Sequence, residues 1–123
     1  MIYDRILFGT AALWNLVAAA MLLWRPEAQL ERMRIADPAA IWLARSFVSS
    51  VATWGIAYGM IAFDPLRFRD FAWLGVISKL LYFSINAVAF QQGRLTREAF
   101  LPALIDLLLA ILFFEYLWRT SGR

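Results

Sequence analysis

The chain has 123 residues, of which 63% are hydrophobic and 16% are aromatic, and its formal net charge is +3. Soluble domains hold only about 45–50% apolar residues, so this composition indicates a protein solvated by lipid, and the length fits a single domain over residues 1–123. The sequence has no cysteine and no histidine, which removes thiol chemistry, the usual zinc and haem ligands and the commonest general base. We therefore expect no metal, no cofactor and no redox enzyme.

Four apolar segments predict transmembrane helices, at residues 6–24, 40–63, 71–90 and 99–118. Each has about the 20 residues that cross a hydrocarbon core of roughly 30 Å as a helix. The first segment ends in Trp24-Arg25-Pro26 and not at a small-residue cleavage site, so we expect it to be retained and not removed as a signal peptide. The predicted fold class is all-α, an integral membrane bundle of four antiparallel transmembrane helices.

The connecting segments carry start and stop signals for these helices. Between the first two spans, residues 25–39 mix apolar and charged side chains in a pattern that predicts a short amphipathic helix on the membrane surface, with a solvated linker as the alternative. Asp37 and Pro38 suit the start of the second helix, as N-cap and first helical residue. Gly93 is expected to cap the end of the third helix, and the segment from Thr96 leads into the fourth.

The basic residues favour lipid headgroups as the charged partner and not nucleic acid. All but one are arginines, which gather at the ends of the spans and form no continuous stripe. The count is tied between the two sides of the membrane, with Arg5, Arg67, Arg69, Arg119 and Arg123 on the side of the termini against Arg25, Arg32, Arg34, Arg94 and Arg97. The free N-terminal amine then favours an orientation with both termini in the cytoplasm, although a tie also permits insertion in both directions.

Three charged residues are predicted at membrane depth, where an ionisable group indicates a functional site by default: Lys79, Arg45 and Asp106. Counting about 1.5 Å per residue from the membrane surface puts Arg45 and Asp106 within one turn of the same height, and both side chains lean toward the same surface. We therefore predict an ion pair between Arg45 and Asp106. Asn86 in the third helix is expected to hydrogen-bond to either partner.

Lys79 shares one face of the third helix with Gly75, Tyr82 and Asn86, because these positions follow the i, i+4, i+7, i+11 spacing. This face is expected to point into the bundle. Asn15, near the middle of the first helix, should meet Lys79 at a similar depth.

The predicted interior then holds two cations, Arg45 and Lys79, against one anion, Asp106. Because this imbalance is costly, either Lys79 is neutral through desolvation and can carry a proton, or an anionic group enters the interior. The structural alternative is that the buried pair only sets the register of the helices and that Lys79 extends to water. Glu115 lies on the opposite face of the fourth helix, where we expect a surface salt bridge with Arg119.

Gly55 and Gly59 form a GxxxG pattern in the second span, which predicts close packing against another helix. The partner helix lies either in the same chain or in another chain. The second case would make the protein a homo-oligomer or part of a larger membrane complex.

Several local patterns link the chain to a known group. They are Trp24-Arg25-Pro26 after the first helix, Arg45 early in the second, and the strings from Leu74 to Lys79 and from Leu101 to Asp106. With these patterns the chain resembles small bacterial four-helix membrane proteins of the DoxX-like group. The resemblance implies the four-helix fold and the membrane location, and it assigns no role to Lys79.

Three functions fit these features. The leading hypothesis is a non-enzymatic inner-membrane protein that binds or conducts a small polar or amphiphilic ligand, with or without proton coupling. An accessory subunit of a larger membrane complex is the first alternative, and an intramembrane enzyme acting on a lipid through Asp106 ranks last because no reaction motif is present. The candidate ligand-binding or proton-carrying residues are Lys79, Asp106, Arg45, Asn86, Asn15 and Tyr82.

Overall fold

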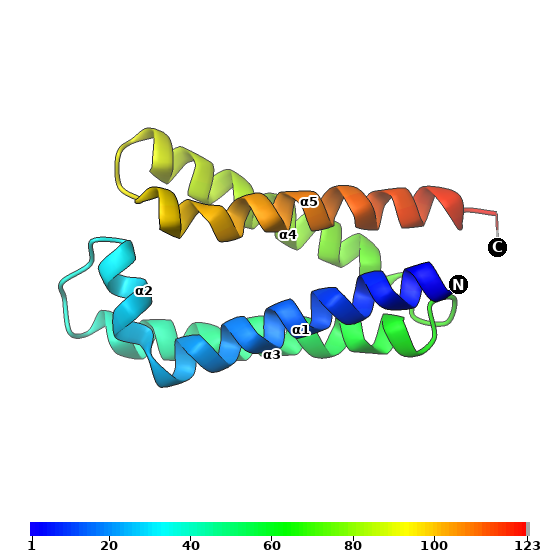
Figure 1. Ribbon diagram of the computed structural model, residues 1–123, viewed down its shortest axis with the longest axis horizontal. Coiled ribbons are helices and arrows are strands. Elements are labelled where there is room, and N and C mark those ends of the chain that lie inside the picture. The colour runs from blue at the N-terminus through cyan, green and yellow to red at the C-terminus, as the bar shows by residue number, and fades with distance from the viewer. Residues whose placement is uncertain (123) are drawn as a thin grey trace.

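The computed structural model of the protein describes residues 1–122 and holds five helices in that range. Four of them are long, and a short helix follows the first: α1 (Ile2–Trp24), α2 (Pro26–Arg32), α3 (Ala40–Phe63), α4 (Phe71–Gln91) and α5 (Arg97–Arg119) (Figure 1). Each long helix has the length and apolar composition needed to cross a membrane. The predicted fold class, an all-α membrane protein with four spanning helices, is confirmed.

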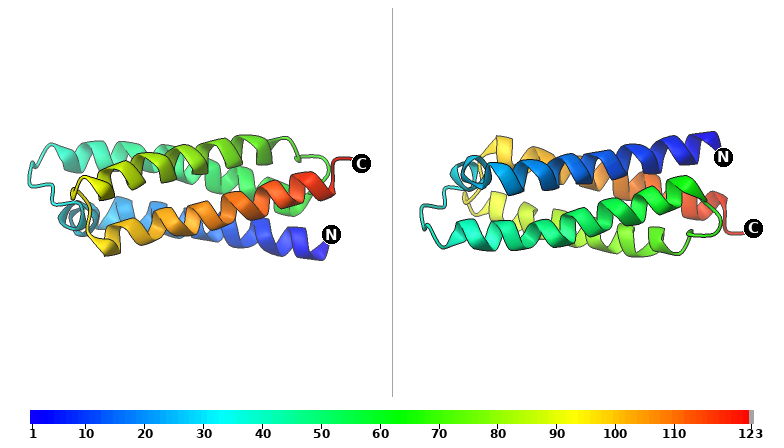
Figure 2. Two further views of the ribbon diagram at one scale, coloured as in Figure 1. Left: turned by 90° about the horizontal axis from the view of Figure 1, so that it is seen from above. Right: turned by 90° about the horizontal axis from the view of Figure 1, so that it is seen from below.

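The long helices run up and down, so both chain termini lie at the same end of the bundle (Figure 1, Figure 2). We call the end with the termini and the 64–70 connection the terminal end. The opposite end, with α2 and the turn between α4 and α5, is called the loop end.

The predicted turn chemistry is confirmed between α4 and α5. Gly93 has a φ of 73°, and the next amide, that of Arg94, donates to the Ala89 carbonyl at 2.9 Å, which closes the last turn of α4. Thr96 caps α5, since its Oγ1 accepts a hydrogen bond from the Ala99 amide at 3.2 Å.

The helix of the second span starts two residues later than Asp37 and Pro38 predict, so Asp37 is not its N-cap. The Asp37 carboxylate accepts a hydrogen bond from the Ala39 amide at 2.9 Å, but residues 38–39 form a turn and α3 begins only at Ala40. Asp37 therefore closes the turn that precedes the helix and not the helix itself.

The amphipathic helix predicted between the first two spans is confirmed as α2. Its Leu30 is buried, whereas Glu27, Glu31 and Arg32 are exposed. The Thr96 hydroxyl at the start of α5 donates to the Arg32 carbonyl at 3.0 Å, so α2 is tied to the loop end of the bundle.

The long helices form two antiparallel pairs, and the GxxxG pattern joins the first of them. α1 is in extensive contact with α3, and α4 with α5, whereas the two pairs touch each other at far fewer places (Figure 1). A Cβ at Gly55 would lie 3.0 Å from Leu16 Cγ and 3.2 Å from Asn15 Cβ, and one at Gly59 would lie 3.9 Å from Ala12 Cβ. The partner helix of the pattern is therefore α1 of the same chain.

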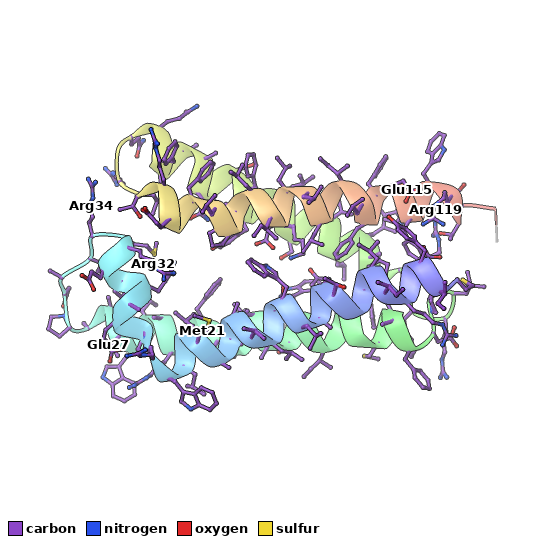
Figure 3. All side chains as sticks on the ribbon, in the orientation of Figure 1. Met21, Glu27, Arg32, Arg34, Glu115 and Arg119 are labelled. Atoms are coloured by element: carbon purple, nitrogen blue, oxygen red, sulfur yellow. The ribbon has the colours of Figure 1, made fainter. Side chains whose placement is uncertain are left out.

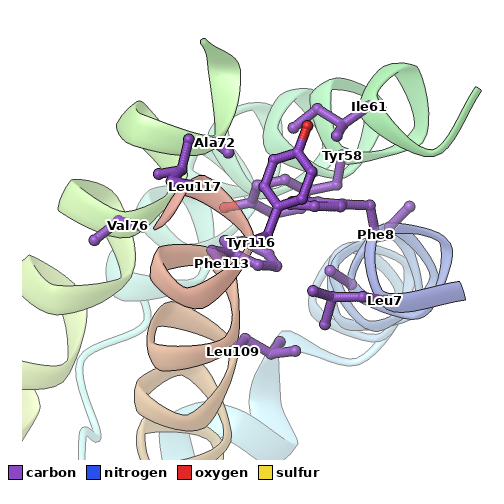
Figure 4. Packing of buried hydrophobic residues seen from close by; sticks show 12 residues of the cluster. Leu7, Phe8, Tyr58, Ile61, Ala72, Val76, Leu109, Phe113, Tyr116 and Leu117 are labelled. Carbon is purple, nitrogen blue, oxygen red and sulfur yellow. The ribbon is translucent and has the colours of Figure 1, made fainter. Parts of the chain in front are cut away.

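The hydrophobic core lies in the terminal half of the bundle, where all four long helices contribute (Figure 4). Its buried residues are Leu7, Phe8, Ala11, Ala12, Tyr58, Ile61, Ala72, Val76, Leu109, Phe113, Tyr116 and Leu117. The Phe113 ring centroid is 4.6 Å from that of Phe8 and 5.1 Å from that of Tyr58. No residue of α3 before Gly55 is buried, and no residue of α4 after Lys79. The two pairs are thus joined in the terminal half and packed less closely toward the loop end.

We predict that Gly75→Ala destabilises the bundle. The added Cβ would lie 2.9 Å from Tyr58 Cε1 and 3.3 Å from the Phe113 ring, and overpacking of this kind costs about 1–3 kcal/mol. The measurement is the free energy of unfolding in mixed micelles titrated with SDS, followed by tryptophan fluorescence. Gly9→Ala is the matched control, because nothing lies within 4 Å of its added Cβ; an equal loss in both variants would contradict the packing.

Candidate functional site

Lys79 is the centre of the candidate site, because residues from the three other long helices surround its ammonium group. Its Nζ donates to Asp106 Oδ1 of α5 at 2.6 Å. The same nitrogen lies 3.5 Å from Asn15 Oδ1 of α1 and 5.2 Å from the ring centroid of Tyr58 of α3. We call these four residues the polar site. The predicted meeting of Lys79 and Asn15 is confirmed.

Two glycines give the neighbours of the lysine their positions. A Cβ at Gly75, one turn before the lysine, would lie 2.9 Å from Tyr58 Cε1, so the missing side chain leaves room for the aromatic ring below the ammonium group. Gly55 lets α1 approach α3 closely enough for Asn15 Nδ2 to donate to the Val51 carbonyl at 3.1 Å. This bond fixes the amide, and its oxygen then faces the lysine.

The polar site holds one positive and one negative charge at membrane depth. The side chains of Lys79 and Asp106 are 5% and 14% exposed, and the pair lies about halfway along α4 and α5. Moving either ion out of water is costly, and the loss is recovered only when both stay together in good geometry. The short hydrogen bond between them meets that condition.

The predicted ion pair between Arg45 and Asp106 is wrong. The Arg45 Nε donates instead to the Leu23 carbonyl at 3.4 Å, and its guanidinium carbon lies 5.3 Å from the Trp42 ring centroid. The estimate of height along the bundle did not tell which helices are paired: α3 is paired with α1, and α5 is paired with α4. Arg45 therefore reaches the end of α1 at the loop end, and Asp106 is left to Lys79.

The predicted charge imbalance is also wrong, since Arg45 is outside the interior and the remaining pair is neutral overall. Asn86 forms neither of its predicted contacts, because its Nδ2 donates to the Tyr82 carbonyl of its own helix at 2.8 Å. The predicted inward face of α4 holds in part: Gly75 and Lys79 are buried, and Tyr82 and Asn86 are half-buried. The arrangement does not call for an anion to balance the site.

Three polar atoms near the pair have no hydrogen-bond partner within residues 1–122. They are Oδ2 of Asp106 and the hydroxyl oxygens of Tyr58 and Tyr82; none of them is fully buried, and within residues 1–122 the fully buried side-chain atom without a partner is Glu115 Oε2. Because they are not fully buried, water or a polar group of a ligand can reach them and supply the hydrogen bonds that the protein does not.

Sequence reasoning missed a second polar cluster, at the terminal end. Arg119 pairs with Glu115 as predicted, and its Nη2 also donates to Asp4 Oδ1 of α1 at 2.6 Å; Figure 3 shows Glu115 and Arg119 together on α5. Asp4 is 2% exposed. The Tyr116 hydroxyl donates to the Pro65 carbonyl, so this cluster ties the chain termini to the 64–70 connection. The buried position of Asp4, so near the start of the chain, had no signal in the sequence.

Comparison of the chain with protein-family models, curated proteins and solved structures gave no match. Within residues 1–122, no group of three or more histidine, cysteine, aspartate or glutamate residues could hold a metal ion. The fold defines the class, a multi-pass membrane protein with four spanning helices. The function has to be inferred from the chemistry of the polar site.

We predict that Lys79 and Asp106 are energetically coupled. Lys79→Met leaves a buried carboxylate alone and Asp106→Asn leaves a buried ammonium group alone, so each single variant should lose about 3–5 kcal/mol of unfolding free energy. The double variant removes both charges and should return to within about 1 kcal/mol of the wild type. Arg45→Gln is the control, with little change expected because Arg45 lies away from the pair, bonded to the Leu23 carbonyl and placed beside the Trp42 ring. SDS titration checks the cycle, and additive losses in the double variant would disprove the pair.

Proposed function

We propose that the protein is a non-enzymatic, multi-pass protein of the bacterial inner membrane that binds a small polar or amphiphilic molecule at the polar site. The observation that carries the proposal is a set of accessible polar atoms without a protein partner beside a buried ion pair: Asp106 Oδ2 and the hydroxyls of Tyr58 and Tyr82. A packed pair that only fixes helix register has no need of such open acceptors in hydrocarbon.

The position of the pair supports access from the loop end. Lys79 is the last buried residue of α4, and Gly55 is the first buried residue of α3, so the pair lies at the border of the closely packed half. Beyond it, toward the loop end, the inward side chains Tyr82 and Asn86 are only half-buried. A ligand that enters between the helix pairs from the loop end would reach Asp106 at the point where the bundle becomes closely packed.

The chemistry of the pair selects the polar group of the ligand. Asp106 already accepts from Lys79 through Oδ1, so its Oδ2 can accept from a hydroxyl or ammonium group without breaking the ion pair. The half-buried faces around it suit an apolar tail. A protonated Asp106 could not hold such a cation, so binding at this carboxylate competes with a proton, which is the form of proton coupling that we propose.

We predict that a primary amine amphiphile stabilises the wild-type protein through Asp106. The probe is dodecylamine, whose N–H groups can donate to Oδ2, and the control probe is dodecyltrimethylammonium, which has the same charge and chain but no N–H. The measurement is thermal unfolding in nanodiscs, followed by tryptophan fluorescence. Dodecylamine should raise the unfolding midpoint, and the gain in unfolding free energy should reach about 2.7 kcal/mol at a concentration of 100 Kd. The control probe should give little stabilisation.

The double variant Lys79→Met with Asp106→Asn separates loss of ligand binding from loss of folding. It should fold as the wild type does and yet lose the stabilisation by dodecylamine. Equal stabilisation of the wild type and the double variant by both probes would show only membrane partition and would end the proposal.

An accessory subunit of a larger membrane complex is the second candidate function. One observation favours it: α3 has no buried residue before Gly55, and large apolar side chains there, such as Trp42, Leu43 and Phe47, are exposed. A partner helix could cover this surface. Extraction in mild detergent should then recover a second protein at fixed stoichiometry, whereas a stable homogeneous protein in nanodiscs without a partner would count against this function.

A further inference from the structure

The short helix α2 lies across the loop end of the bundle, between the two helix pairs (Figure 1). It has seven residues and contacts α1 and α3 of one pair and α5 of the other. α2 therefore links the two pairs on the loop-end side of the polar site.

Between α2 and the polar site the bundle is packed loosely. No residue of α3 before Gly55 is buried, and none of α4 after Lys79. Tyr82 and Asn86, which follow Lys79 along α4, are only half-buried. Water or a ligand that passes α2 would therefore meet no closely packed layer before it reaches the ion pair.

Thr96 ties α2 to the other helix pair through one hydroxyl group. This hydroxyl accepts from the Ala99 amide at 3.2 Å as the cap of α5, and it donates to the carbonyl of Arg32, the last residue of α2, at 3.0 Å. Arg34 adds a longer contact, from its Nη1 to the Gly93 carbonyl at 3.4 Å. The same side chain thus starts α5 and holds the end of α2.

The apolar contact that seats α2 is small. Pro26 and Leu30 are its buried residues, and neither belongs to the hydrophobic core of the terminal half. The charged residues of the helix, Glu27, Glu31 and Arg32, are exposed. A short helix with little buried apolar surface and one well-formed bond to α5 can detach locally while the rest of the bundle stays folded.

The connections on both sides of α2 allow such a movement. Arg25 is the single residue between α1 and α2, and Pro26 cannot continue the first helix because it has no amide hydrogen. On the other side, residues 33–39 form turns and irregular structure before α3. Hinges are commonly built from a few residues of this kind at the ends of helices.

We propose that α2 is a gate over the polar site, held closed by the hydrogen bond from Thr96 to the Arg32 carbonyl. Opening of this gate controls the access of water and ligand from the loop end to Lys79 and Asp106. The gate rests on the proposed function, because it regulates entry to the ligand site named there.

The test measures access to a thiol placed below the gate, in a chain that has no cysteine of its own. Asn86→Cys supplies the thiol, and a cationic, membrane-impermeant methanethiosulfonate reagent labels it in nanodiscs. In this background Thr96→Asp keeps an oxygen to cap α5 but has no hydrogen to donate to Arg32. Loss of that hydrogen bond should raise the labelling rate roughly three- to tenfold.

Thr96→Asn is the matched control, because its amide oxygen caps α5 as well as a carboxylate does and its N–H can donate to the Arg32 carbonyl. It should label as slowly as the chain with Thr96. An equal rise in the Asp and Asn variants would overturn the gate.

A second variant and a second thiol position complete the test. Leu30→Ala weakens the seat of α2 without altering α5, and it should raise the labelling rate at position 86 even if Thr96→Asp disturbs the start of α5. Gln92→Cys, at an exposed position after α4, should label at a rate that neither variant changes.

An unchanged rate at position 86 in both Thr96→Asp and Leu30→Ala would overturn the proposal. A rise of the same size at positions 86 and 92 would indicate general loosening of the loop end and would also overturn it. The labelling contains no ligand, so its result is separate from the binding of dodecylamine at the polar site.

Discussion

An ammonium group at membrane depth needs a partner of opposite charge, and the structure is arranged around that requirement. Lys79 is the only lysine of the chain, and within residues 1–122 its ion-pair partner is Asp106 on the neighbouring helix. The cost of separating the two in hydrocarbon fixes the rotation of α4 against α5. Gly75 leaves room for the Tyr58 ring of α3, and Asn15 of α1 turns its amide oxygen to Lys79, so the other helix pair meets the first at the same site.

The uneven packing of the bundle supports the proposal that this pair has a role beyond helix register. Phe8, Tyr58 and Phe113 close the terminal half with a continuous aromatic core, and the second polar cluster around Arg119 fastens the termini there. Toward the loop end the two helix pairs have few contacts. A bundle joined firmly at one end can open at the other at low cost, because few buried contacts have to be broken. The polar site lies at that border.

Much of the fold could be predicted from the sequence because it depends on local rules. The length of the apolar segments predicted the four spans, and Gly93 and Thr96 predicted the turn between the last two helices. The spacing of Gly75 and Lys79 predicted the inward face of α4. These features depend only on residues close in sequence.

The partners of buried charges could not be predicted with the same certainty, because they depend on which helices are neighbours. Depth alone made Arg45 as good a partner for Asp106 as Lys79, and only the pairing of α3 with α1 decides between them. The contact between Asp4 and Arg119 joins the two ends of the chain and has the same cause. The GxxxG pattern at Gly55 indicated close packing, but its partner became clear only from the three-dimensional arrangement.

The most direct test of this account is the distance between the two charged groups of the polar site in a lipid bilayer. Because the chain has one lysine, ¹⁵N-labelled lysine marks the Lys79 Nζ alone, and solid-state NMR can measure its dipolar coupling to the ¹³C-labelled carboxyl carbon of Asp106. The account predicts a strong coupling, as the 2.6 Å hydrogen bond to Oδ1 requires, together with slow exchange of the ammonium protons with water. A lysine nitrogen without coupling to Asp106 and in fast exchange with water would contradict it.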